Sequence, residues 1–491
     1  MDIYAEARSR ISSVGLPSQD QILNDIIQTA QDLGRLSNYT FILGLPMLLN
    51  PPESPLPCRE TPVEADTISA DFTAQIRGLL GALESSHVLD AQAIADGKPS
   101  MLEKNLALTI KIQRQSFDRH LKCLHRSYPT YTLSLTVFPA NLPLLPGVTK
   151  LRLFSASNDA AAIHFHDVRP VALSVPLLLL SRFPDLQELG CPWLWERLPI
   201  PFKAPSLRHY TRQWAALLRE TRRQFRNAVE KLQGQIPAPM TKARLWFWRP
   251  SLVPEEDQGE PLPDFLWPLG EDPVSLGLCT LASHLEELDL RAFLTPEIFN
   301  PAVPWTRMRR LRVEFHPRQP DGGWYFIGPL GENLCAESPN NRGFWIQLED
   351  YPSHASREED SIVDDEFLTK SKGLDGSDRE SPTLAFAQAL RYMPALEEAE
   401  LFAYLTWKPS EKRKIDYEED APYDEGVHRW GLKYTPAKEG RKGLLEWPVG
   451  SWRPQAHVTR LFVGGSDGLN VIWKPFEFMD MRPEGDQDAY I

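Results

Sequence analysis

Cysteine is scarce in this chain of 491 residues, and no two cysteines are closely spaced. The five cysteines are Cys58, Cys123, Cys191, Cys279 and Cys335. There is no C-x-x-C pair, and the odd count argues against a disulfide framework. The pattern favours reduced thiols and therefore predicts a cytoplasmic or nuclear protein.

Long apolar runs are also missing, as is the basic start and apolar run of a secretory signal. The most lipid-like stretch, residues 171–180, is too short to span a bilayer and contains Pro176. We therefore expect neither secretion nor a membrane partner.

An excess of positive charge is absent too. Lys and Arg number 53 against 66 Asp and Glu, which gives a formal net charge of −13. Proteins that bind nucleic acids normally concentrate positive charge to attract phosphates, so we expect no nucleic-acid partner. One local basic cluster is an exception, and it consists of Arg212, Arg219, Arg222, Arg223 and Arg226.

Tryptophan is unevenly distributed, because all 14 residues occur from Trp193 onward. Ahead of that point, apolar residues recur at helical spacing within residues 72–83 and 102–124, which predicts two helices. Residues 131–137 alternate apolar and other side chains, which predicts a strand. We interpret residues 1–130 as a helical N-terminal region, 131–475 as the main domain and 476–491 as a C-terminal tail.

Two segments of the main domain have few apolar residues and many charges. They are residues 356–380, which are acidic and rich in Ser and Gly, and residues 408–425. Such segments bury too little apolar surface to offset the entropy of ordering, so we expect mobile insertions.

Two distant stretches, residues 180–189 and 390–399, can be aligned with one another. In each, an apolar helix-like run stops at a proline, Pro184 or Pro394, and an L-x-x-L-x-L-type triplet begins two residues later. Proline lacks a backbone N–H and restricts the residue before it, so the helices should end at Phe183 and Met393. A strand is expected next in both stretches.

Looser copies of this triplet begin at Val148, Leu207, Leu285, Met308 and Val458. Triplets that begin at residues 186 and 207, and at 285 and 308, are 21 and 23 residues apart, within the roughly 20 to 29 residues of a leucine-rich repeat. A unit of this kind cannot bury its apolar face alone, so it needs stacked neighbours. The sequence therefore predicts an α/β protein with an irregular leucine-rich-repeat-like solenoid.

Residues 211–233 form the clearest amphipathic helix of the chain. The apolar stripe consists of Trp214, Leu217, Leu218, Thr221, Phe225, Ala228 and Leu232. Packing against a core explains such a stripe, and the arginines then form a solvated basic face. A helix that binds a partner is the alternative.

Two motif-like matches suggest catalysis. Ser466 lies in a G-x-S-x-G match, but a strand-like segment follows it and no histidine does, so a glycine-rich turn is the better interpretation. His164 and His166 share one face of an extended segment and could supply half of a zinc site, but no second Cys/His cluster has the spacing to complete it. We therefore expect a non-catalytic protein without metal or cofactor; the alternative is a serine hydrolase or metal-dependent enzyme that uses these residues.

Aromatic clusters follow two of the predicted repeat strands. One contains Trp193, Trp195 and Arg197, and the other contains Trp324 and Tyr325. Trp, Tyr and Arg dominate the energetics of protein interfaces, and loops after repeat strands commonly bind partners. These five residues are our candidate partner-binding residues, and the alternative is that they fill gaps between irregular repeats.

Several segments resemble fungal F-box/leucine-rich-repeat-like proteins, a large and mostly uncharacterised group. The segments are residues 191–197, 310–317, 389–394 and 428–434. The resemblance implies a non-catalytic substrate receptor of a ubiquitin ligase, in which F-box helices bind a Skp1-type adaptor and the repeats select a target protein. A recognisable F-box is absent, because only Leu16-Pro17-Ser18-Gln19 resembles its start.

Overall fold

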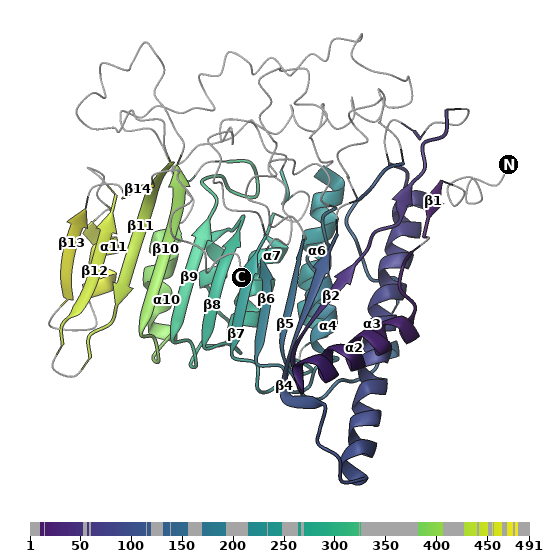
Figure 1. Ribbon diagram of the computed structural model, residues 1–491. Helices are drawn as coiled ribbons and strands as arrows, with labels where there is room; N and C mark the ends of the chain where they lie inside the picture. The colour runs from purple at the N-terminus through teal and green to yellow at the C-terminus, as the bar shows by residue number, and fades with distance from the viewer. Residues whose placement is uncertain are drawn as a thin grey trace. The chain divides into compact units, whose positions relative to one another are not determined.

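The computed structural model describes most of the chain (Figure 1). The described residues are 10–13, 15–52, 56–57, 60–113, 115–118, 131–137, 139–155, 169–192, 215–232, 234–247, 264–266, 270–323, 325, 382–405, 427–438, 441–449, 454, 456–463, 469–474 and 477–479. Within these ranges, no helix combines the length and the apolar character needed to cross a membrane.

The chain forms two compact units. Described residues up to 192 and those within Gln224–Leu245 belong to the first unit, whereas residues 215–223 and those from Trp246 onward belong to the second. The domain boundary predicted near residue 130 therefore lies inside the first unit.

The first unit contains a parallel sheet whose strands follow their order in the chain. The order is β2 (Leu36–Leu43), β4 (Leu102–Ile112), β5 (Val148–Ser155), β6 (Glu188–Pro192) and β7 (Lys242–Trp246). The pairs β2–β4, β4–β5 and β5–β6 are all parallel. A separate short ladder joins β1 (Ile11–Ser12) to β3 (Met47–Leu48).

Capping residues explain where the helices of this unit begin. Helix α2 (Gln19–Leu33) starts after Ser18, whose side chain accepts a hydrogen bond from the Gln21 N–H while the Gln21 side chain returns to the Ser18 N–H. Thr61 and Glu64 form the same capping box at α3 (Pro62–Ala95). A short helix, α4 (Val175–Leu180), precedes β6, and the 3-10 helix η2 spans Pro139–Asn141.

The helix predicted within residues 102–124 is wrong, because Leu102–Ile112 is strand β4. Leu102, Leu106 and Ile110 are spaced by four, which fits both a helix face and a strand face. Leu108 and Ile112 are also buried, so the period of two is the correct one. The strand predicted at residues 131–137 is reduced to one isolated bridge between Leu133 and Val171.

The second unit has a mixed, mostly parallel sheet. Its strands are β8 (Glu287–Ala292), β9 (Arg310–Phe315), β10 (Glu398–Leu405), β11 (Val427–Thr435), β12 (Gly443–Pro448), β13 (Leu469–Lys474) and β14 (Glu477–Met479). The first three are parallel, β11 is antiparallel to both β10 and β12, and β13 is parallel to β12. Strand β14, within the predicted C-terminal tail, pairs with β11.

Helices cover one face of this second sheet. They are α7 (Pro273–Ala282), the 3-10 helix η5 (Pro296–Phe299), α10 (Pro382–Ala389) with η7 (Leu390–Tyr392), and α11 (Ala456–Val463). Phe462 of α11 contacts the rings of Tyr434 and Trp447, which project from the same face as the buried Leu401 and Leu432. Figure 1 shows α10 and α11 on this side of the strands.

Both stretches fold as a helix, a proline and a strand in that order, although α4 ends at Leu180, three residues before the predicted Phe183, whereas η7 ends at Tyr392. Helix α4 and the pair α10–η7 end before Pro184 and Pro394, and β6 and β10 follow. The turns around Pro184 and Pro394 have equivalent hydrogen bonds, from Leu186 N to Phe183 O and from Leu396 N to Met393 O, both 3.1 Å long. The mixed α/β class is thus confirmed.

Only some of the looser triplets lead into strands. Those at Val148, Leu285 and Met308 lead into strands β5, β8 and β9. The triplet at Val458 lies in helix α11 because its apolar residues also have helical spacing, and Leu207 lies outside the described residues. The predicted insertions at 356–380 and 408–425 also lie outside them.

Candidate interaction surface

Most of the residues singled out from sequence lie outside the described part of the chain. These are Trp193, Trp195, Arg197, Trp324, His164, His166 and Ser466. Tyr325 is described, and its hydroxyl donates a hydrogen bond to the Leu294 carbonyl at 2.5 Å. Burial raises the pKa of Tyr325 well above its usual value. Because its ring also meets Phe315 at 5.5 Å, Tyr325 holds its loop against the end of β8.

A row of alternating charges crosses one face of the second unit's sheet, the face opposite to α7, α10 and α11. Asp289, Arg312 and Glu400 are register neighbours on β8, β9 and β10. Arg312 bonds Asp289 at 3.0 Å and Glu400 at 3.4 Å, and Glu400 bonds Arg429 of β11 at 2.5 Å. We name these four residues the charge ladder. Asp289, Arg312 and Glu400 each face the opposite sign in register, which favours this register over its alternatives. Arg429 is the register partner of Tyr404, and its side chain reaches Glu400 diagonally.

An aromatic ring lies within the charge ladder. The guanidinium groups of Arg312 and Arg429 lie 4.7 and 4.1 Å from the ring centroid of Phe402. Attraction between a cation and the ring face holds both arginines in place. Gly431 is the register partner of Phe402, and a Cβ there would lie only 2.6 Å from the Phe402 Cβ and from the Leu401 carbonyl oxygen. Glycine is therefore required by packing at this position.

Side-chain exposure on this face falls from the amino to the carboxyl end of the parallel strands β8, β9 and β10. On β9 the side chains of Arg310, Arg312 and Glu314 are 57, 37 and 3% exposed. At the buried end, Arg291 donates to Glu314 at 2.7 Å and its guanidinium lies 4.3 Å from the centroid of Trp246. The accessible part of this face is thus the half that contains the amino ends of β8, β9 and β10 and Lys433 near the carboxyl end of the antiparallel β11.

The sequence contains a signal for this surface that our sequence analysis missed. Charged residues occupy every second position of Glu287–Ala292, Arg310–Phe315 and the first half of Glu398–Leu405. In a strand these positions share one face, opposite to the apolar positions between them. The signs pair only across strands, so the pattern becomes informative once the strands are aligned.

A second charged cluster is buried in the same unit. Arg222 of α6 (Ala215–Lys231) bonds Asp272, whose carboxylate also accepts from the Ser275 N–H and hydroxyl at the start of α7. Helix α6 confirms the amphipathic prediction, but the expected solvated position of Arg222 is wrong. Arg222 precedes Phe225 by three residues and Val229 by seven, so it belongs to the buried stripe.

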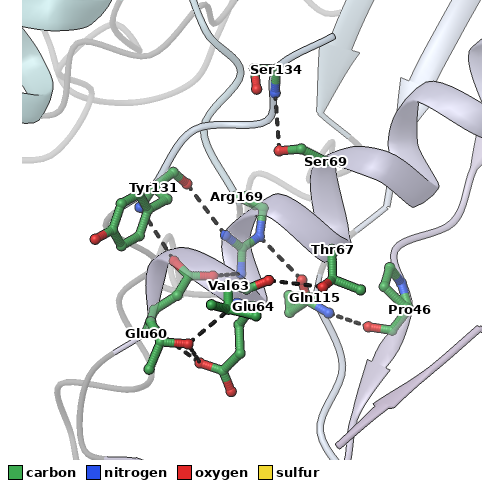
Figure 2. Close-up of polar contacts among 11 residues, drawn as sticks. Pro46, Glu60, Val63, Glu64, Thr67, Ser69, Gln115, Tyr131, Ser134 and Arg169 are labelled. Atoms are coloured by element: carbon green, nitrogen blue, oxygen red, sulfur yellow. Dashed lines mark hydrogen bonds and ion pairs between the residues drawn. The ribbon is translucent and has the colours of Figure 1, made fainter. Parts of the chain in front are cut away.

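Figure 2 shows a buried polar cluster in the first unit, centred on Arg169. The Arg169 cluster consists of Glu60, Gln115, Tyr131 and Arg169. Arg169 lies 2.6 Å from Glu60 and donates to Gln115 at 3.2 Å and to the Tyr131 carbonyl at 3.3 Å. The Tyr131 N–H in turn donates to Glu60 at 3.3 Å. Each partner comes from a different segment of the chain, so the cluster ties these segments together.

Within the described residues, no three His, Cys, Asp or Glu side chains gather to hold a metal ion. Burial raises the pKa of the Cys279 thiol to about 12 and that of Cys191 further, which makes both thiols poor nucleophiles. The paired charges of the charge ladder and the Phe402 ring held by two arginines are features suited to binding a partner rather than to catalysing a reaction.

Comparisons of the chain with family models, curated proteins and solved structures found no match.

Proposed function

We propose that this protein is a non-catalytic protein-interaction scaffold with a leucine-rich-repeat-like body. The proposal rests chiefly on a hydrogen-bond pattern that recurs where the strands begin. In this pattern, the carbonyl of the residue just before one strand accepts hydrogen bonds from two consecutive N–H groups at the start of the next strand. The carbonyl of Gln187 accepts from Thr241 N and Lys242 N at 3.0 and 3.1 Å. The Glu286 carbonyl accepts in the same way from Arg309 N and Arg310 N.

The next strand repeats this arrangement. The Arg309 carbonyl accepts from Glu397 N at 2.8 Å and from Glu398 N at 3.2 Å. Within each unit, parallel strands that are neighbours in the chain are also neighbours in the sheet, which is typical of stacked repeats. This recurring hydrogen-bond pattern supports equivalent repeats that each contribute one strand to the sheet.

The accessible half of the charge-ladder face is the proposed binding surface. Helices cover the other face of the second unit's sheet, whereas Glu287, Arg310, Glu398 and Lys433 are partly exposed on this one. Positive and negative side chains alternate here, so a partner with the complementary order of charges would gain specificity. A uniformly charged polymer would meet both signs.

The cellular role we propose is that of a ubiquitin-ligase substrate receptor that binds a Skp1-type adaptor. The resemblance of the four segments named above to F-box/leucine-rich-repeat-like proteins supports it. Helices α2 and α3, which contact each other near Gln19 and Gly81, are the available helical elements for such an adaptor.

Affinity purification of the full chain followed by mass spectrometry tests both parts. A variant with Arg310→Glu and Lys433→Glu should lose its target proteins, because both signs would be reversed on the accessible surface. The matched control carries Arg226→Glu, at a partly exposed position, and Lys98→Glu, at an exposed one, both in the first unit. Recovery of the same proteins with the ladder variant would contradict the binding surface.

The adaptor is scored separately in the same experiment. Wild type and both variants should recover a Skp1-type adaptor equally. If the targets are recovered without any adaptor, the scaffold role stands and the ubiquitin-ligase role is wrong.

A further inference from the structure

One row of charged side chains crosses the second unit's sheet from β8 to β12 in unbroken register. We name it the register row, and it consists of Asp289, Arg312, Glu400, Lys433 and Glu446. Each residue is the register partner of the next, and the sign of the charge changes at every step. Because neighbouring strands lie about 4.8 Å apart, the signs alternate with that spacing.

The charges of the register row are accessible to a partner. The side chains of Arg312 and Lys433 are 37 and 43% exposed. Those of Asp289, Glu400 and Glu446 are 23, 21 and 20% exposed. A partner with charges of one sign would be repelled at every second strand, whereas a partner with alternating signs would be attracted at each strand.

An apolar residue follows the last charge of the row. Ile472 of β13 is the register partner of Glu446, so the two side chains lie on the same face of the sheet. Ile472 is 37% exposed, and an apolar side chain of a partner would gain burial against it. From β8 to β13, the face therefore has a defined order of acidic, basic, acidic, basic, acidic and apolar residues.

The spacing of the row distinguishes a helix from an extended strand. The four steps from Asp289 to Glu446 cover about 19 Å. Residues i, i+3, i+7, i+10 and i+14 of a helix share one face and cover about 21 Å. Every second residue of an extended strand would cover about 26 Å in four steps. The strand would then be displaced by more than one strand spacing, which brings like charges together.

We propose that the partner of this face is an α-helix that lies across the strands, with alternating basic and acidic side chains along one side. Its basic side chains lie over the three carboxylates of the register row, and its acidic side chains lie over the two cations. An apolar residue at one end of the helix contacts Ile472. The inference rests on the proposed scaffold function and names the class of partner that this surface binds.

Two designed helical peptides of identical composition test the proposal. In the alternating peptide, positions i, i+3, i+7, i+10, i+14 and i+17 are Lys, Glu, Lys, Glu, Lys and Leu. In the block peptide, the same positions are Lys, Lys, Lys, Glu, Glu and Leu, which creates two contacts between like charges. Fluorescence anisotropy with the full chain should show that the alternating peptide binds at least about tenfold more tightly. The preference should shrink as salt is added.

A variant of the protein tests the register row directly. Lys433→Gln removes one cation and should weaken binding of the alternating peptide at least about threefold. The matched control, Lys98→Gln, makes the same change at an exposed position of the first unit and should leave binding unchanged. Equal effects of the two variants would contradict a site on the register row.

Three other results would overturn the helical partner. They are equal binding of both peptides, no binding of either at about 1 mM, and tighter binding of an extended peptide with the same alternation. Self-association of the full chain that Lys433→Gln weakens would assign the face to a second copy instead. The scaffold function is judged separately, because loss of target proteins from the variant with Arg310→Glu and Lys433→Glu would still support the binding surface if the helical peptide fails.

Discussion

Arg222 donates two hydrogen bonds to one oxygen of Asp272, from Nε at 3.0 Å and from Nη2 at 2.6 Å. The two side chains are 1 and 0% exposed. Arg222 also donates to the Phe293 carbonyl at 2.9 Å, and Asp272 accepts from two backbone N–H groups of α7. The pair therefore joins α6, α7 and the end of β8 within the second unit.

Arg222→Met should lower the free energy of unfolding by about 3 to 5 kcal/mol, because it leaves the Asp272 carboxylate buried without its counter-charge. Chemical denaturation followed by tryptophan fluorescence measures the loss. Arg223→Met is the matched control, since the Arg223 side chain is 58% exposed and should contribute within about 0.5 kcal/mol. Equal effects of the two variants would contradict the buried pair.

Arg169→Met should destabilise the first unit by a similar amount, about 3 to 5 kcal/mol, because Glu60 would lose its buried partner. Hydrogen exchange provides a local measurement: the Tyr131 amide, which donates to Glu60, should exchange faster. In the control, Arg152→Met, a partly exposed ion pair with Glu188 is lost at little cost. Unchanged exchange at Tyr131 would argue against the Arg169 cluster.

Two glycine substitutions should change the free energy of unfolding in opposite directions. Gly431→Ala should cost about 1 to 3 kcal/mol, because its Cβ would overlap Phe402 and the Leu401 carbonyl. Gly78→Ala lies inside helix α3, where the nearest atom, Ile22 Cδ1, would be 3.6 Å from the new Cβ. Alanine favours the helix, so a gain of about 0.5 to 1 kcal/mol is expected. Thermal unfolding of both variants gives the comparison.

Stability should fall in mild acid because of His316. Burial, with Arg318 nearby, lowers the pKa of His316 to about 3. The unfolded chain binds a proton at His316 near pH 6.5, whereas the folded chain does not. The contribution of neutral His316 to the free energy of unfolding is therefore complete above pH 6.5 and declines as the pH falls toward 3. Between pH 7 and pH 5 the loss should be about 2 kcal/mol.

The free energy of unfolding measured against pH checks this prediction. His316→Asn should flatten the decline, whereas His457→Asn, at an exposed position of α11, should keep the wild-type slope. An unchanged slope in His316→Asn would assign the acid sensitivity to other groups.

Local features of the fold were predictable from neighbouring residues. Pro184 and Pro394 prevent their helices from continuing for steric reasons that need no tertiary contact, although α4 already ends at Leu180. The apolar stripe of α6 follows from helical spacing alone. Leu102–Ile112 was not predictable in this way, because its apolar residues fit two periods and only the pairing with β2 and β5 selects the strand.

The amino-acid sequence by itself determined the mixed α/β character, the prolines that end helices and the alternation of charged and apolar residues along β8, β9 and β10. Tertiary structure alone decided that Arg312 faces both Asp289 and Glu400, and that Arg222 is buried while Arg223 is exposed. The physical reason is range. Backbone sterics and periodicity act between residues close in the chain, whereas the burial and pairing of a charge depend on which distant segment packs against it.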